Sequence, residues 1–320
     1  MPTPLVAIVT PIYNGEEFLA EMLESVQAQT YPNLVHVILE NNSTDKTLEI
    51  IESYSNGRVP ILLHKNEVTL PRMENWNRAF ELAPTDAEYV RLLCADDTIT
   101  PDCIDEMVKV GEMDPEIGVI GCLHSCAGEI QDFFWDKNRN VFDGLEANRM
   151  TLLRQGVIMP VQMMMRQKFV RMRTPLFQGP LTGGFDLDTK MNLLTYSKFG
   201  FVHKSLGMTR VHENTVSAVE YGPKTRSWTS DGLYLMNKYG PAAFGTDYDA
   251  ASKQFINYYI RRIMSWKKSD GGTQNLQRHF DALQDVGLSF NWSSKTKAMF
   301  DWILIKLGIR RNWTGYPGWQ

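Results

Sequence analysis

Short apolar runs alternate with amphipathic stretches along the first 122 residues of this 320-residue chain. Residues 5–10 are nearly all apolar, which is typical of a strand buried on both faces of a sheet. Residues 16–29 carry apolar side chains at the spacing of one helix face. The same alternation predicts further strands at 34–39, 60–63, 88–93 and 117–122, and helices at 43–54, 72–83 and from Pro101 onward.

Repeated β-α units with short connections require a mainly parallel sheet with right-handed crossovers. We therefore predict an α/β, Rossmann-like fold in which helices flank a mainly parallel sheet. Ligands of such sheets bind beyond the carboxyl ends of the strands, so polar residues at those ends are the first candidates for a site.

The second half of the chain has a different pattern. Residues 186–199 are predicted to be helical, and a short strand follows at 201–202. Beyond residue 225 the pattern is helical throughout, at 229–239, 248–266, 274–286 and 294–308. We expect one domain over residues 1–217 and a helical C-terminal region over residues 218–320.

Composition and charge narrow the classes of function. Hydrophobic residues make up 43% and charged residues 22%, which is ordinary for a globular protein. The net charge of −4 argues against a nucleic-acid binder. Residues 251–320 hold 11 Lys and Arg against 4 Asp, so this tail carries +7 and the remainder carries −11. A basic tail indicates a surface that meets something anionic.

The four cysteines are expected to be free thiols, because no secretory signal opens the chain and a reducing cytoplasm follows. Cys122 and Cys126 have the spacing of half a zinc site, but no second pair lies nearby, which favours buried small side chains. No apolar stretch reaches the roughly 20 residues that span a bilayer. The expected location is the cytoplasm, including the inner face of the cell membrane.

Polar clusters follow four successive predicted strands: residues 10–14, residues 40–45, Arg72 and residues 94–97. Any one of them alone is explained by turns and helix caps. Together they supply an aromatic ring, an acceptor for a base edge, a guanidinium and paired carboxylates. Those groups suit a nucleoside diphosphate with a divalent cation.

In this order, the motifs TPIYN (10–14), ENNSTDKT (40–47) and ADD (95–97) before Pro101 resemble the inverting family 2 glycosyltransferases of GT-A fold. The resemblance covers roughly residues 5–217. It implies transfer of a sugar from a nucleoside-diphosphate-sugar to the hydroxyl of a saccharide or lipid-linked acceptor, in surface polysaccharide or glycolipid synthesis. The implied cofactor is Mn²⁺ or Mg²⁺.

The resemblance implies that Thr10, Pro11 and Tyr13 line the pocket for the donor base. Glu40 occupies the acidic position that contacts the base, and Asn42 is a further donor-binding residue. The family usually has Asp at this position. Because the acceptor oxygen of Glu40 lies one methylene further out, the replacement bears on nucleobase preference.

The strand-four motif is implied to bind the metal through Asp96, with Asp97 as a second ligand, while Arg72 contacts the pyrophosphate. Cys94 replaces the first Asp of the usual motif, and a thiol is a weak acceptor. Mg²⁺ and Mn²⁺ often take only one or two carboxylates plus substrate phosphates. The alternative is that Asp96 and Asp97 only cap the helix near Pro101.

The resemblance places the catalytic base in Gly183–Asp188, before a predicted helix, with Asp186 the best match and Asp188 the fallback. A carboxylate can take the proton of an acceptor hydroxyl as the new bond forms. The metal offsets charge on the leaving diphosphate. Helix capping remains the simpler interpretation of both residues.

Arg210 and His212 resemble the Arg-x-His segment that often ends the GT-A unit. Arg210 is expected to pair with phosphate, and His212 to ligate the metal or a diphosphate oxygen. Without that resemblance, a lone histidine is more often structural.

Trp and aliphatic side chains in the C-terminal tail are mixed with Lys and Arg. The apolar members are Met299, Phe300, Trp302, Ile303, Leu304, Ile305 and Leu307, and the basic members are Lys295, Lys297, Lys306, Arg310 and Arg311. This mixture suits a helix lying in a membrane interface. Two other interpretations stay open: a helix packed on the catalytic domain with a solvated basic face, and a helix that forms a homodimer.

Two further classes of function stay open beside the metal-dependent transferase, and one is excluded. Because Cys94 breaks the usual motif, the chain is alternatively a catalytically inactive nucleotide-sugar-binding protein of the same fold. A sugar nucleotidylyltransferase needs a Gly-rich phosphate loop with Lys or Arg, which residues 10–17 lack. A peripheral membrane adaptor is the non-catalytic alternative for the tail.

Overall fold

The computed structural model describes residues 3–131, 134–156, 162–181, 183–212, 215, 226–269, 276–310 and 313. The chain forms two compact units whose segments interleave in sequence. The sheet unit comprises Met1–Gly144, Ile158–Gly179 and Asp186–Val211, and the helical unit comprises Leu145–Val157, Pro180–Phe185 and His212–Gln320. The division of the chain into functional domains at residue 217 stays a prediction.

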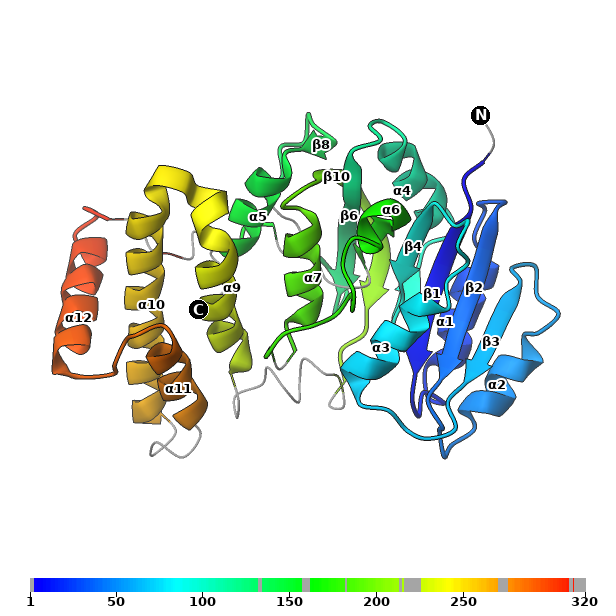
Figure 1. Cartoon of the computed structure of the whole chain (residues 1–320), viewed down its shortest axis with the longest axis horizontal. Coiled ribbons are helices and arrows are strands. Elements are labelled where there is room, and N and C mark those ends of the chain that lie inside the picture. The colour runs from blue at the N-terminus through cyan, green and yellow to red at the C-terminus, as the bar shows by residue number, and fades with distance from the viewer. Residues whose placement is uncertain are drawn as a thin grey trace. The chain divides into compact units, whose positions relative to one another are not determined.

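The sheet unit contains a mixed, mainly parallel sheet of strand order β3-β2-β1-β4-β9-β6-β10-β5, with β7 paired to β6 and β8 to β10 (Figure 1). The parallel pairings are β1 with β2 and β4, β2 with β3, and β6 with β10. These strands span β1 Val6–Ile12, β2 Leu34–Glu40, β3 Ile61–Lys65, β4 Tyr89–Leu92, β6 Ile117–Cys126 and β10 Lys198–Thr209. The predicted α/β class is confirmed.

Four short strands complete the sheet and were not predicted. They are β5 Thr98–Ile99, β7 Glu129–Gln131, β8 Val141–Phe142 and β9 Met164–Arg166. The last one, β9, lies between β4 and β6 and is antiparallel to both. It contains Met164 and Met165, and its three residues are too few to show a strand period.

The helix predicted at 186–199 was too long. Helix α7 spans Phe185–Leu193, and β10 begins at Lys198. Phe199 and Phe201 alternate along β10, and their rings pack on Trp135 at centroid distances of 4.7 Å and 5.5 Å. This aromatic packing explains why the segment is a strand rather than the end of a helix.

The other helices of the sheet unit are α1 Leu19–Gln27, α2 Thr47–Ser53, α3 Arg72–Glu81, α4 Cys103–Gly111 and α6 Gln167–Val170. Helix α1 buries Leu19, Met22, Leu23 and Val26, the face that the apolar spacing predicts. These side chains share one hydrophobic core with Val6 and Ile8 of β1 and with Ile104 and Met107 of α4. The core therefore fixes α1 and α4 on the sheet and leaves the strand ends to present polar groups.

The helical unit contains most of α5 Gly144–Leu152, then α9 Ser227–Phe244, η2 Gly245–Asp247, α10 Tyr248–Ser269, α11 Gln277–Asp285 and α12 Trp292–Lys306. Helix α10 packs beside α9 and α12 (Figure 1, yellow to red). The predicted C-terminal helical region is confirmed. Within the described residues, no helix combines the length and the hydropathy needed to cross a bilayer.

Candidate functional site

The loops that follow β1 and β2 are joined by hydrogen bonds from backbone to side chain. Three N–H groups of the first loop donate to the second: Asn14 N to Ser43 Oγ at 3.0 Å, Gly15 N to Thr47 Oγ1 at 2.8 Å and Glu16 N to Asp45 Oδ2 at 3.0 Å. Two bonds run the other way, from Thr44 N to Asn14 Oδ1 and from Lys46 N to Glu16 Oε2. Much of the polar motif at 40–47 therefore fixes loop geometry.

The loop after β1 also lies against the turn after β4. A Cβ atom on Gly15 would lie 2.7 Å from Ile12 Cδ1 and 3.5 Å from Ala95 Cβ, so a larger residue here would displace the end of the Ile12 side chain. Three polar segments that are far apart in sequence, after β1, β2 and β4, consequently meet at one edge of the sheet. This is the edge at which parallel α/β sheets bind ligands.

This loop pair presents two of the predicted base contacts. Tyr13 is half exposed, and Glu40 is buried at the end of β2, where a carboxylate oxygen accepts the N–H of Ser43. Asn42 is exposed in a left-handed conformation (φ 58°), with its amide nitrogen 3.5 Å from Thr69 Oγ1.

Thr10 and Pro11 differ from Tyr13 in accessibility. Thr10 is fully buried, and its hydroxyl is 2.9 Å from the ring nitrogen Nε2 of buried His36. Burial lowers the pKa of His36 to about 3, so this ring is neutral and structural. The side chain of Thr10 faces the core, which leaves only its backbone for a ligand, while Pro11 is half-buried.

A buried network of three asparagines orients the chain before α3 and was not predicted. Asn41 Oδ1 accepts hydrogen bonds from Asn66 Nδ2 at 2.7 Å and from Leu70 N at 2.9 Å. Asn66 Nδ2 also donates to Asn75 Oδ1 at 2.9 Å. Since Leu70 comes just before the start of α3, the network positions Arg72. Isolated amides have no sequence period that could reveal such a network.

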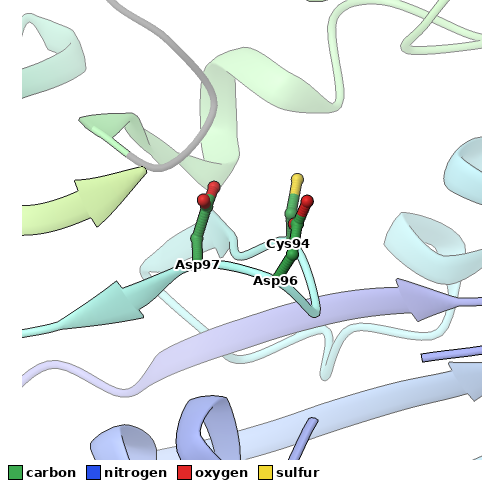
Figure 2. A group of neighbouring side chains, drawn as sticks. All are labelled: Cys94, Asp96 and Asp97. Atoms are coloured by element: carbon green, nitrogen blue, oxygen red, sulfur yellow. The ribbon is translucent and has the colours of Figure 1, made fainter. Parts of the chain in front are cut away.

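Cys94, Asp96 and Asp97 form a compact group of potential metal ligands in the turn after β4. Their ligand atoms all lie within 4.8 Å of one another, and Figure 2 shows the three side chains rising from this turn toward the same side. Burial and the charge of Asp96 raise the pKa of Asp97. Burial and the same two carboxylates raise the pKa of the Cys94 thiol.

The chemistry of this group fits a divalent cation. Two carboxylates held close together repel each other when both are ionised, and a cation between them removes that repulsion. Asp96 and Asp97 supply the oxygen ligands that Mg²⁺ and Mn²⁺ prefer, whereas the Cys94 sulfur is a softer donor. The predicted ligands Asp96 and Asp97 are thus brought together.

Arg210 connects the end of β10 to the turn after β4 that contains Cys94, Asp96 and Asp97, called here the acidic turn. Its backbone N–H donates to Asp97 Oδ1 at 3.1 Å, and its Nε donates to the carbonyl oxygen of Asp96 at 3.2 Å. Its Nη2 lies 2.6 Å from Glu21 Oε2, and the guanidinium stands 4.6 Å from the ring centroid of Phe18. Arg210 therefore fixes both aspartates in place, and its predicted phosphate contact stays a prediction.

His212 belongs to the helical unit, so the geometry of the acidic turn does not include it. It is half-buried, and its carbonyl oxygen accepts hydrogen bonds from the N–H and the hydroxyl of Thr215 at 3.1 Å and 3.0 Å. Its predicted role as a ligand stays a prediction.

Asp186 lies in the first turn of α7 and is 9% exposed. Burial raises its pKa to about 6. A hydrogen bond from Leu187 N and the positive charges of Lys190 and Arg72 act in the opposite direction and lower the pKa. The charges of Asp186 and Arg72 also act on the Cys94 thiol. The structure therefore brings Asp186 and Arg72 to the same electrostatic neighbourhood as the acidic turn.

Lys190 lies one turn after Asp186, is 2% exposed and was not singled out from the sequence. Burial lowers its pKa to about 7, while the charge of Asp186 opposes this shift. A lysine at i+4 faces the same side of a helix as the aspartate at i. Lys190 is thus placed to respond to the protonation state of Asp186.

The fallback residue Asp188 is fully buried in an ion pair. Arg173 Nη2 contacts its carboxylate, and Arg173 Nη1 donates to its carbonyl oxygen at 3.0 Å. Both side chains are at most 5% exposed. A buried carboxylate that is ion-paired with an arginine is not accessible to an acceptor. This favours Asp186 over Asp188 as the candidate base.

The segment that leads into Asp186 is held by a residue of α9 that the sequence did not indicate. Asp231 Oδ2 accepts the N–H of Gly184 at 3.1 Å and that of Gly183 at 3.5 Å. A Cβ on Gly184 would lie 3.1 Å from the same oxygen, closer than nearly all Cβ contacts. Within the helical unit, Asp231 therefore fixes the turn at Gly183 and Gly184, which precedes Asp186 in the chain.

Comparison with known proteins gives a consistent result. The family model described as "Glycosyl transferase family 2" matches residues 7–173. An uncharacterized glycosyltransferase of Methanocaldococcus jannaschii is 33% identical over 122 residues, which are 38% of this chain and 41% of that protein. One of Rickettsia typhi is 25% identical over 218 residues, or 66% of this chain and 65% of that protein.

Solved structures extend the likeness to nearly the whole chain. TarS 1–349 from S. aureus, solved in complex with UDP-GlcNAc, has a TM-score of 0.65 and 17% identity over 96% of this chain and 91% of that one. The mannosyltransferase PcManGT from Pyrobaculum calidifontis, solved with GDP-Man and Mn²⁺, has a TM-score of 0.61 and 14% identity over 96% of this chain and 86% of that one. At these identities the structural likeness concerns the fold, which is of GT-A type. The matched parts span about two fifths of the first curated relatives.

Proposed function

Since the chain belongs to glycosyl transferase family 2, we propose that it transfers a sugar from a nucleoside-diphosphate-sugar to an acceptor hydroxyl with inversion at the anomeric carbon. The observation that carries the proposal is the pair Asp96 and Asp97 at the sheet edge, with Arg72 and Asp186 within electrostatic reach of the same turn. The reaction needs carboxylates that hold a metal, a cationic side chain that pairs with phosphate, and a buried carboxylate that takes a proton.

The donor is bound through the loops after β1 and β2. The half-exposed ring of Tyr13 provides a stacking surface for the base, and Glu40 with Asn42 provides polar contacts beside it. Pro11 and the backbone of Thr10 complete this wall. Arg72 pairs with the pyrophosphate, and Arg210 contributes charge after exchanging Glu21 for phosphate.

Asp96 and Asp97 would hold Mn²⁺ or Mg²⁺, with His212 as a further candidate ligand. A bound cation supplies charge stabilisation to the leaving diphosphate. Arg210 holds the carboxylate of Asp97 and the backbone of Asp96 in place. The proposed cofactor is supported by these oxygen donors and by the Mn²⁺ in the PcManGT complex.

Asp186 is the proposed general base. Its pKa of about 6 leaves it mostly ionised at pH 7 and closer to neutrality than an ordinary aspartate, which suits proton removal. It accepts the proton of the acceptor hydroxyl as that oxygen attacks the anomeric carbon opposite the leaving diphosphate. Lys190 stabilises the ionised form of Asp186 before the proton arrives.

We propose a saccharide or lipid-linked acceptor, a role in surface polysaccharide or glycolipid synthesis and a cytoplasmic location. Residues 1–217 would bind the donor and carry out transfer, and residues 218–320 would contact a partner or a membrane. UDP- and GDP-linked sugars are the first donors to test, because TarS and PcManGT were solved with such ligands.

A second candidate function is binding of a nucleotide sugar without transfer. Cys94 favours it, because a thiol stands beside Asp96 and Asp97 as the third member of the potential ligand group. A panel of UDP- and GDP-sugars with Mn²⁺ separates the two functions. The transferase releases nucleoside diphosphate from one donor, whereas the binding protein gains thermal stability and releases none.

The same panel tests the proposal itself by thermal unfolding. A donor at about 100 times its Kd stabilises the native state by about 2.7 kcal/mol, and we expect this shift only when Mn²⁺ or Mg²⁺ is present. Asp186→Asn is the matched variant that should keep the shift. A panel in which no nucleotide sugar changes the melting temperature, with or without metal, rejects both candidate functions.

A further inference from the structure

Helix α12 is fixed to the helical unit by one face only. Ala298 and Asp301 are its buried residues, with exposures of 0% and 1%, and the helix packs on α10. The carboxylate of Asp301 forms ion pairs with Arg261 of α10 and with Arg310, which lies four residues beyond the end of α12. Asn291 and Ser294 form a capping box at the start. The orientation of α12 is therefore well defined.

The opposite face of α12 exposes large apolar side chains to solvent. At 100° per residue, Trp292, Met299 and Ile303 point about 130–170° away from the side that Ala298 and Asp301 bury. The exposed apolar residues of this outer face are Trp292, Met299, Phe300, Ile303 and Leu307, with exposed Trp302 on its flank, and Trp292 is 83% exposed. Single exposed apolar residues are ordinary, but five on one side of a helix mark a binding surface.

The exposed charged residues of α12 itself are all positive. Lys295, Lys297 and Lys306 lie on the helix, and the acidic residue Asp301 is buried and paired with two arginines. Lys306 Nζ stands 5.5 Å from the ring centroid of Trp302, and Lys295 Nζ stands 4.5 Å from that of Phe290. When the CH₂ groups of a lysine pack along an aromatic ring, its ammonium group can stay in water at the border of an apolar surface.

We propose that the outer face of α12 binds the surface of an anionic lipid bilayer. Aromatic and aliphatic side chains enter the interface between headgroups and acyl chains, and the lysines pair with anionic headgroups. The helix is about 22 Å long, so it lies along the surface rather than spanning the bilayer. A second copy fits this face less well, because pairing two such faces brings the lysines of both copies together.

The proposal does not depend on sugar transfer, and it gives the helical unit a function of its own. If both proposals hold, the membrane would retain the enzyme where a lipid-linked acceptor lies. Either one can fail alone, since vesicle binding is measured without donor and donor binding is measured without vesicles.

The test is flotation of the full chain with vesicles of phosphatidylcholine, with and without phosphatidylserine. We expect binding to the anionic vesicles that weakens with salt. Replacing Lys295, Lys297 and Lys306 by Gln should weaken it about a hundredfold, since each lysine near the surface contributes about fivefold. The matched control replaces Lys65, Lys109 and Lys168 by Gln, which lie exposed on the sheet unit and should leave binding unchanged.

A second set of variants tests the apolar contacts. Trp292, Phe300 and Leu307 changed together to Ser should abolish flotation, whereas Val68 and Met113, equally exposed elsewhere, can be changed to Ser without effect. Circular dichroism confirms that each variant is folded, and Phe300→Ser alone serves if the triple variant is not. No flotation of the wild-type chain, or flotation that neither set of variants changes, overturns the proposal. A dimer that the same serine variants dissociate, without vesicle binding, assigns the face to a second copy instead.

Discussion

Asp96 and Asp97 lie close together in one turn, where the charges of Arg91 and Arg210 only partly oppose the burial and repulsion that raise the pKa of Asp97. At the start of α7, by contrast, Asp188 is paired with Arg173, and Asp186 shares its buried helix face with Lys190. The turn of residues 94–97 therefore keeps a repulsion between two carboxylates that a bound cation would relieve, whereas a buried cationic side chain lies beside each carboxylate of α7. This difference separates the residues that should respond to metal from those that should not.

The two regions also differ in how the chain builds them. The acidic turn lies beside the loop after β1, and hydrogen bonds join residues 14–16 of that loop to residues 43–47 after β2. Both loops directly follow their strands. The turn that precedes Asp186 in the chain is held differently, because the N–H groups of Gly183 and Gly184 donate to one side chain, Asp231 of α9. Substitution of Asp231 should therefore change the rate of transfer without changing donor binding.

The largest expected effect is at the base. Asp186→Asn removes the proton acceptor while keeping the shape of the side chain, so kcat should fall by about 10²–10⁴-fold. Donor binding in the presence of Mn²⁺, measured by calorimetry, should stay within about twofold of wild type. Normal turnover by this variant would show that another group takes the proton.

The next largest effect is at the metal. Asp96→Ala should lower kcat/KM for the donor by about 100-fold or more, because loss even of groups that only support ligands costs 10–100-fold in metal affinity. Raising the Mn²⁺ concentration should recover part of the loss, as measured by release of nucleoside diphosphate. Asp105→Ala, at an exposed acidic residue of α4, is the control and should not change kcat/KM.

The pH dependence should follow Asp186. The base acts when ionised, so the rate is full above pH 7 and declines as pH falls through about 6, where burial places the pKa of Asp186. Between pH 7 and pH 5 the ionised fraction falls by about tenfold. Stopped assays at saturating donor measure kcat across this range, and a rate that is flat down to pH 5 would exclude Asp186 as the base.

The helical unit should contribute a smaller effect through Asp231. Asp231→Ala removes the acceptor for the N–H groups of Gly183 and Gly184, so we expect kcat to fall several-fold with KM for the donor unchanged. Asp231→Asn keeps an oxygen acceptor and should restore most of the rate. Equal losses in both variants, or a change in KM alone, would argue that Asp231 only stabilises the fold.

The smallest expected effect is at Cys94. Cys94→Asp returns the turn to the usual family motif and adds an oxygen ligand, so Mn²⁺-dependent donor binding should tighten several-fold. If the wild-type chain binds donor without turnover and this variant gains turnover, the chain is the inactive binding protein. Cys94→Ser is the control for loss of the thiol alone.

The strand-edge region could be predicted from sequence because its motifs directly follow strands with clear apolar periods. The positions of Asp96, Asp97 and Tyr13 at this edge could be predicted in this way, and their roles stay predictions. Strand β9 could not be predicted, since three residues show no period and its partners β4 and β6 are distant in sequence. The helix over 186–199 was predicted too long, because the aromatic packing of β10 on Trp135 is a tertiary interaction.

The roles of individual polar residues were harder to predict than their positions. Ser43, Asp45 and Thr47 belong to a motif that suggests ligand binding, yet their side chains accept hydrogen bonds from the neighbouring loop. Thr10 belongs to the predicted base pocket, but its hydroxyl is buried against His36. Asp231 and Lys190 could not be predicted as part of the site. A single charged residue on a helix is normally solvated, and no sequence pattern distinguishes the exceptions.

The most direct test of the metal site is a Mn²⁺ titration followed by electron paramagnetic resonance, with and without UDP- or GDP-sugar. The free Mn²⁺ signal should decrease at one site per chain when donor is present, in the wild-type protein and in Asp186→Asn alike, and should not decrease in Asp96→Ala. Equal Mn²⁺ binding by Asp96→Ala and wild type, or donor binding that needs no metal, would contradict the assignment of the acidic turn.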